Sequence, residues 1–135
     1  MAVVDKRREN ANETRQTNII GGPVEGKICF MFDDMISTAS SICGAAELVH
    51  KSGAREIHLA ATHGVLCGSA IERLRTAPVN SVCITNTIPL PAEKGIERIR
   101  VLSVAQLLAE AIKRIHHHKS ISEMFRPPDE DRGEH

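Results

Sequence analysis

Apolar and polar residues alternate along the chain in blocks that predict strands and helices in turn. The short apolar runs Ile28–Phe32, Ile57–Thr62, Val82–Thr85 and Ile99–Leu102 are typical of strands, and Ala2–Val4 is a shorter fifth. The first of these four runs has no polar interruption, which predicts a strand buried on both of its faces.

Segments with helical periodicity separate these runs. From Ile42 to Val49, apolar side chains recur at positions i, i+3, i+4 and i+7, and Gly53 is a suitable C-terminal stop. A shorter helix is predicted around Ala70–Leu74. Strands that alternate with helices predict an α/β fold, with a mostly parallel sheet flanked by helices on both faces.

The strongest helical pattern runs from Val104 to Ile115, and Ser103 with Gln106 predicts a capping box at its start. From residue 126 the composition turns to Pro, Asp, Glu, Arg and Gly, which cannot bury a core. We therefore expect one domain over residues 1–125 and a disordered tail over 126–135.

Composition narrows the classes of partner. Lys plus Arg number 17 and Asp plus Glu number 17, so the net charge of zero disfavours a nucleic-acid-binding arm. Three Phe with no Trp or Tyr disfavour a surface that stacks bases. No apolar run is long enough to span a membrane. The four cysteines stand singly, which favours reduced thiols and predicts a cytoplasmic protein.

Candidate chemistry lies after Phe32, because ligands of open parallel sheets bind beyond the carboxyl ends of the strands. Asp33 and Asp34 leave the predicted strand there, and residues 37–41 form a hydroxyl-rich turn into a helix. Carboxylates of this kind bind a sugar diol or a hydrated Mg²⁺, and a helix N-terminus suits a phosphate. A simple helix cap is the alternative that spacing alone leaves open.

The run from Ile28 to Ile42 resembles the phosphoribosyl diphosphate signature of the type I phosphoribosyltransferase fold. More narrowly, it resembles the ribose-phosphate diphosphokinase (phosphoribosyl diphosphate synthetase) family. The resemblance extends over nearly the whole chain and covers the C-terminal part of the family. Further matching segments are Val4–Arg8, Ala61–Gly64, Ser69–Glu72, Thr85–Pro89, Leu108–Ile115 and Ser120–Phe125.

This resemblance implies an activity in nucleotide biosynthesis. Family members transfer diphosphate from ATP to ribose 5-phosphate with Mg²⁺, giving 5-phosphoribosyl 1-diphosphate, and they form homo-oligomers. Lys6 and Arg8 are then the catalytic cations on a mobile loop, suited to the charge of a transferring diphosphoryl group. The substrate-binding residues implied are Asp33, Asp34, Ser37, Thr38, Ala39, Ser40 and Ser41.

Two positions depart from the family signature. Ser37 stands where the family has a third Asp, and Ser40 stands where it has Gly, so a side chain is added beside the phosphate. The family's N-terminal half, with most of the ATP site, has no counterpart in this chain, nor does the first strand and helix of the C-terminal domain. We therefore expect ATP to bind only with a partner half, and the chain alone to be inactive.

The alternative is a non-catalytic regulatory or associated subunit that joins complete diphosphokinase subunits in a hetero-oligomer. A third possibility is a truncated product without a function of its own. A separate reading frame for the N-terminal half would favour a split enzyme. Two histidine features carry no site: His116–His118 are consecutive helix positions about 100° apart, and His63 is interpreted as structural.

Overall fold

The computed structural model describes the backbone of residues 2–10 and 13–125, and the predicted tail over 126–135 lies outside them. The chain divides into two compact units, one up to Leu102 and one beginning at Ser103. No helix in these described ranges is long and apolar enough to cross a membrane.

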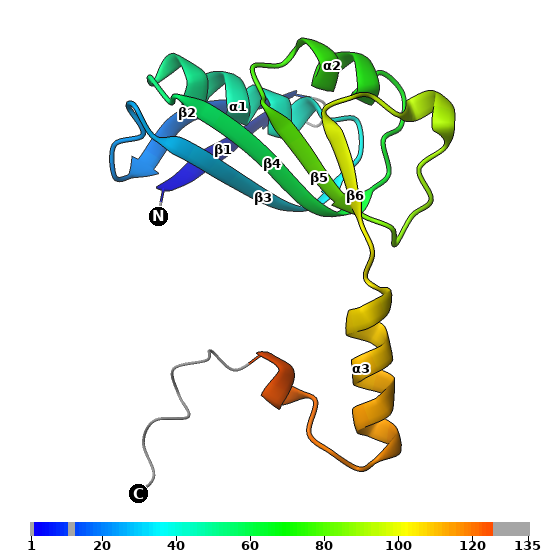
Figure 1. Ribbon diagram of the computed structural model, residues 1–135. Coiled ribbons are helices and arrows are strands. Elements are labelled where there is room, and N and C mark those ends of the chain that lie inside the picture. The colour runs from blue at the N-terminus through cyan, green and yellow to red at the C-terminus, as the bar shows by residue number, and fades with distance from the viewer. Residues whose placement is uncertain (1, 11–12, 126–135) are drawn as a thin grey trace, which may run out of the picture. The chain divides into compact units, whose positions relative to one another are not determined.

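The centre of the first unit is a parallel sheet of four strands in the order β3-β4-β5-β6 (Figure 1). This confirms the predicted α/β fold class. The strands are β3 (Ile28–Ile36), β4 (Glu56–Gly64), β5 (Ser81–Thr85) and β6 (Ile99–Leu102). Each predicted run lies inside one of them.

A two-stranded antiparallel sheet precedes this parallel sheet. It is formed by β1 (Ala2–Asn10) and β2 (Glu13–Gly21), with irregular register on either side of Lys6–Arg8. The sequence predicted only Ala2–Val4 as a strand and missed β2 entirely. Residues 13–18 of β2 are all polar and Ile19 and Ile20 are adjacent, so no alternating apolar period marks the strand, and its pairing with β1 decides its conformation.

Two helices cover one face of the parallel sheet, α1 (Ser40–Lys51) and α2 (Ala70–Thr76), as Figure 1 shows. Gly53 follows α1 with a φ of 87° and donates its N–H to the carbonyl of His50, as expected for a C-terminal stop. Between the helices and the sheet lies an aliphatic core. Its fully buried side chains include Ile57, Leu59, Leu74, Val82 and Ile84.

The prediction of helices on both faces is wrong for this unit. Phe30 and Phe32 on the opposite face are 65% and 78% exposed, and the Phe30 ring stacks on that of His58 with centroids 5.1 Å apart. Each strand is added on the same side of the previous one, and right-handed crossovers then place both helices on one face. The apolar run of β3 therefore has one covered face and one open face.

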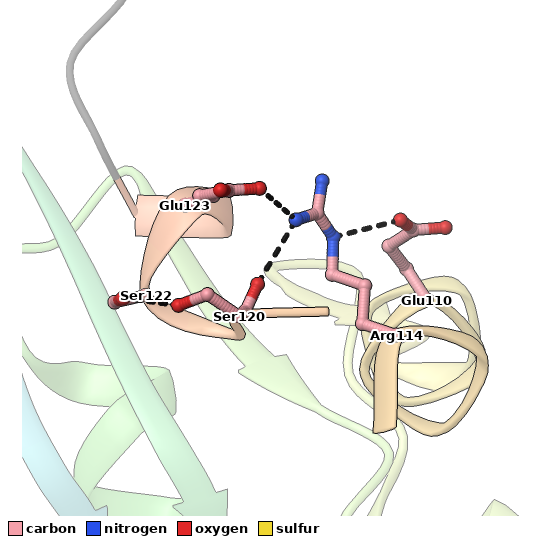
Figure 2. A network of polar contacts seen from close by, with 5 residues as sticks. All are labelled: Glu110, Arg114, Ser120, Ser122 and Glu123. Carbon is pink, nitrogen blue, oxygen red and sulfur yellow. Dashed lines mark hydrogen bonds and ion pairs between the residues drawn. The ribbon is translucent and has the colours of Figure 1, made fainter. Parts of the chain in front are cut away.

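The second unit contains α3 (Ala105–His116) and the short 3₁₀ helix η2 (Ser122–Phe125). Arg114 connects them, with Nε donating to Glu110 at 2.9 Å and one Nη donating to Glu123 at 2.8 Å and to the Ser120 carbonyl (Figure 2). The hydrogen bonds to Glu123 and Glu110 raise the pKa of the Arg114 guanidinium above its ordinary value. At the helix start, the N-cap position is Val104, one residue after the Ser103 of the predicted capping box, and the Ser103 hydroxyl accepts from the N–H of Ala105 at 3.2 Å.

Gly64, the last residue of β4, is required by close packing against β5. A Cβ at this position would lie 2.5 Å from Cδ1 of Ile84, whose side chain is fully buried. We expect Gly64→Ala to lower the free energy of unfolding by about 1–3 kcal/mol, the usual cost of overpacking, as measured by urea denaturation.

Gly22→Ala is the matched control, because nothing lies within 4 Å of a Cβ there, and its effect should stay within about 0.5 kcal/mol. Adding Ile84→Val removes the crowding methyl, so the double variant should be more stable than the sum of the single effects predicts. Strict additivity would show that the contact with Ile84 does not limit position 64.

Candidate functional site

Strand β3 continues past Phe32 to Ile36, because Met35 and Ile36 pair with His63 and Gly64 of β4. The expected turn directly after Phe32 is therefore wrong, and the turn begins at Ser37. Within the extended strand, successive side chains point to opposite faces. Asp33 is half-buried on the helix-covered side, and Asp34 is exposed on the side of Phe32.

The two carboxylates therefore do not point the same way. The Asp33 carboxylate accepts a hydrogen bond of 2.9 Å from the backbone N–H of Asp34, which ties its orientation to the strand. Asp34 extends toward solvent on the open face. A ligand at this end of the sheet can meet one carboxylate from each side of β3.

The loop from Ser37 to Ser41 leads directly into the N-terminus of α1. Ala39 is buried and has a φ of 60°, in the left-handed region. Ser37, Thr38 and Ser40 are exposed. The N–H groups of the first turn of a helix lack intrahelical partners and favour an anion. The predicted phosphate-binding residues thus lie together at the carboxyl end of β3.

The segment after β4 holds the other side of this loop. The carbonyls of Ile36 and Ser37 accept from the N–H groups of Leu66 and Cys67, both at 3.0 Å, and the Ser37 hydroxyl lies 3.2 Å from the Cys67 sulfur. The Thr38 carbonyl accepts from Nη1 of Arg73, in α2, at 2.7 Å. Arg73 was missed in the sequence, where it is one of several charged residues of a short helix.

A second polar group forms at the carboxyl ends of β4 and β5. The hydroxyls of Thr85 and Thr87 both donate to the carbonyl of Thr62, at 2.7 and 3.1 Å. Nδ1 of His63 lies 2.9 Å from the Thr87 hydroxyl. This network links the carboxyl ends of β4 and β5, and the interpretation of His63 as a structural residue stays a prediction.

Lys6 and Arg8 lie on β1, so the expected catalytic loop begins as a strand of the β1-β2 hairpin. Their backbones pair with Gln16 and Thr14, respectively. Their assignment as catalytic cations stays a prediction.

Cys43 lies one turn into α1, behind the loop. Burial raises the pKa of its thiol, Glu47 raises it further, and the Arg73 charge lowers it. Its side chain is buried, whereas the other three thiols are half-buried, and all four are free. Cys43 is therefore a protonated core residue at neutral pH.

Comparison with known proteins identifies relatives of this chain. Residues 5–126 match the family model described as the phosphoribosyl synthetase-associated domain. A ribose-phosphate pyrophosphokinase of Rhodopirellula baltica is 69% identical over 126 residues, covering 93% of this chain and 40% of that protein. One from Caldanaerobacter subterraneus is 53% identical, with 93% and 39% covered.

A solved structure is similar as well. The crystal structure of phosphoribosylpyrophosphate synthetase from Mycobacterium smegmatis superposes with a TM-score of 0.69 at 38% identity, covering 81% of this chain and 35% of that one. The chain thus spans about two fifths of the length of the curated relatives it matches. The resemblance to ribose-phosphate diphosphokinases, for which pyrophosphokinase is another name, is confirmed.

Alkylation tests the placement of Cys43. In the folded protein at mildly alkaline pH, we expect iodoacetamide to modify Cys43 more slowly than Cys67, because burial hinders access and the raised pKa leaves less thiolate. Mass spectrometry of peptides after timed labelling measures both rates, and in urea they should converge. Equal rates in the folded chain would contradict the burial of Cys43.

Proposed function

The chain belongs to the family of the phosphoribosyl synthetase-associated domain, and on that premise we propose that it binds ribose 5-phosphate or 5-phosphoribosyl diphosphate at the carboxyl end of β3. The observation that carries the proposal is the loop 37–41, which joins a strand bearing two carboxylates to a helix N-terminus. The helix N-terminus suits the 5-phosphate, and carboxylates suit the ribose hydroxyls.

Each part of the substrate then has a partner of matching chemistry. Asp33 and Asp34 accept hydrogen bonds from the ribose hydroxyls, and residues 37–41 hold the 5-phosphate. Lys6 and Arg8 of β1 neutralise the diphosphate, as a point charge and a planar fork respectively. We assign no step of transfer to the 135-residue chain alone, which we expect to bind the sugar phosphate without forming product.

The residues also fit Mg²⁺, which protein sites bind through one or two carboxylates together with substrate phosphates. In the described part of the chain no group of three or more His, Cys, Asp or Glu could hold a metal ion, so the ion would come with the phosphates. Asp33 and Asp34 point to opposite sides of β3, so one of them would be its protein ligand. When bound, Mg²⁺ would neutralise charge on the diphosphate.

Regarding partners, we propose that the chain forms a homo-oligomer through the open side of β3. Within the described sheet β3 pairs with β4 alone, and unpaired strand edges recruit other strands. The neighbouring open face exposes Phe30 and Phe32, which also favours association. Association with complete diphosphokinase subunits, as a regulatory subunit, is the alternative, and ATP would enter the site only with such a partner.

Restoring the family signature should strengthen binding. We expect the double variant Ser37→Asp, Ser40→Gly to bind ribose 5-phosphate at least about tenfold more tightly than the wild type. A hydrogen bond to a charged group is worth about 1.5–3 kcal/mol, and the missing side chain lets backbone N–H groups approach the phosphate. Isothermal titration calorimetry measures both affinities, and Asp34→Asn in the same background should lose affinity.

Ribose without phosphate is the matched ligand control and should gain little from Ser40→Gly. No detectable ribose 5-phosphate binding by either protein, with circular dichroism unchanged, would contradict the proposed binding function. Tighter binding by the wild type would show that the two serines are effective replacements and that the signature residues are not needed.

Oligomerisation has its own test. We expect sedimentation velocity at micromolar concentration to show a dimer or larger species. Phe30→Lys with Phe32→Lys should shift it toward monomer, because two charges cannot be buried unpaired in an interface. Leu107→Lys, an exposed apolar position on α3, is the control for added charge. A wild-type monomer would overturn the proposed assembly.

A further inference from the structure

Three consecutive carbonyls at the start of the loop over residues 37–41 accept hydrogen bonds from the segment after β4 and from α2. Those of Ile36 and Ser37 accept from backbone N–H groups, and that of Thr38 accepts from the Arg73 side chain at 2.7 Å. The first two bonds are independent of side-chain identity. The third exists only because residue 73 carries a donor long enough to reach across from α2.

The direction of these carbonyls also decides the direction of the amides. In a trans peptide the C=O and the next N–H point in opposite directions, and no cis peptide occurs in the described chain. The N–H groups of Ser37, Thr38 and Ala39 therefore point away from the β4–α2 side. This is the orientation that a phosphate bound at the loop requires.

The last of these three peptides differs from the others because its carbonyl accepts from a side chain and not from a backbone N–H group. It joins Thr38 to Ala39, and Ala39 has a φ of 60°, which is unfavourable for a residue with a Cβ. The Arg73 bond acts on this peptide directly. The guanidinium charge also lies close enough to the start of α1 to lower the pKa of Cys43, so it adds positive potential beside the loop.

We propose that Arg73 is a positioning residue of the sugar-phosphate site, which by holding the Thr38 carbonyl keeps the Thr38–Ala39 peptide turned with its N–H toward the bound 5-phosphate. This inference rests on the proposed function. On this proposal, a side chain of α2, the helix that follows β4, sets the backbone geometry of the phosphate-binding loop over residues 37–41. Such a contact is specific to the tertiary fold.

A matched control lies on the same helix. Arg75 is exposed, and its side chain makes no hydrogen bond or ion pair with any residue that the structure describes. Arg73→Met and Arg75→Met therefore remove the same charge and the same donor from α2. The backbone hydrogen bonds of Arg73, to Ser69 and from Ala77, remain in both variants.

Two measurements test the inference. The ¹³C chemical shift of the Thr38 carbonyl reports its hydrogen bond in the free protein. We expect it to move in Arg73→Met, to stay near the wild-type value in Arg73→Lys, which keeps one donor, and to be unchanged in Arg75→Met. Calorimetric titration with ribose 5-phosphate should show about tenfold weaker binding for Arg73→Met, partial recovery in Arg73→Lys and no change in Arg75→Met.

The outcomes separate this inference from the proposed function. If the wild type binds ribose 5-phosphate and Arg73→Met binds it equally, Arg73 has no positioning role and the proposed function stands. If an equal loss occurs in Arg75→Met, the effect is one of general charge and the inference is wrong. If the wild type binds no ribose 5-phosphate, the proposed function fails and the ligand role of Arg73 fails with it.

Discussion

Right-handed crossover between parallel strands is the constraint on which the first unit depends. Strands β3 to β6 are added in one direction, so each crossover returns on the same side of the sheet. Helices α1 and α2 consequently cover one face, and the aliphatic core forms between them and β4 and β5. The same rule leaves Phe30 and Phe32 on the other face without a cover in this unit.

The parallel arrangement also gathers the candidate site. Carboxyl ends of parallel strands meet at one edge, which brings the loop after β3 beside the loop after β4 and the threonines at the end of β5, Thr85 and Thr87. Hydrogen bonds from Leu66, Cys67 and Arg73 then hold the carbonyls of residues 36–38 on the side of β4 and α2. The site is therefore built by neighbouring strand–helix units together, although most of its residues come from one stretch of sequence.

Family membership bears on which substrate the chain binds, and chain length bears on whether it can catalyse transfer. The phosphoribosyl synthetase-associated domain accounts for residues 5–126, whereas the curated relatives are about two and a half times as long as the part matched here. The sugar-phosphate binding proposed here uses only groups present in this chain. Diphosphate transfer also needs an ATP site, which is why a partner subunit belongs to the proposal.

The sequence by itself determined the α/β class, the four parallel strands, the helices and the signature that runs from β3 into α1, because periodicity and motifs are local properties. Ile99–Leu102 and the stop at Gly53 agree with the structure for this reason. Only the tertiary structure decided the length of β3, which β4 extends to Ile36, and hence the opposite directions of Asp33 and Asp34. It alone paired β2 with β1 and brought Arg73 to the Thr38 carbonyl, 35 residues away in the chain. Hydrogen bonds between distant segments leave no periodic trace, so the pattern of single residues cannot predict them.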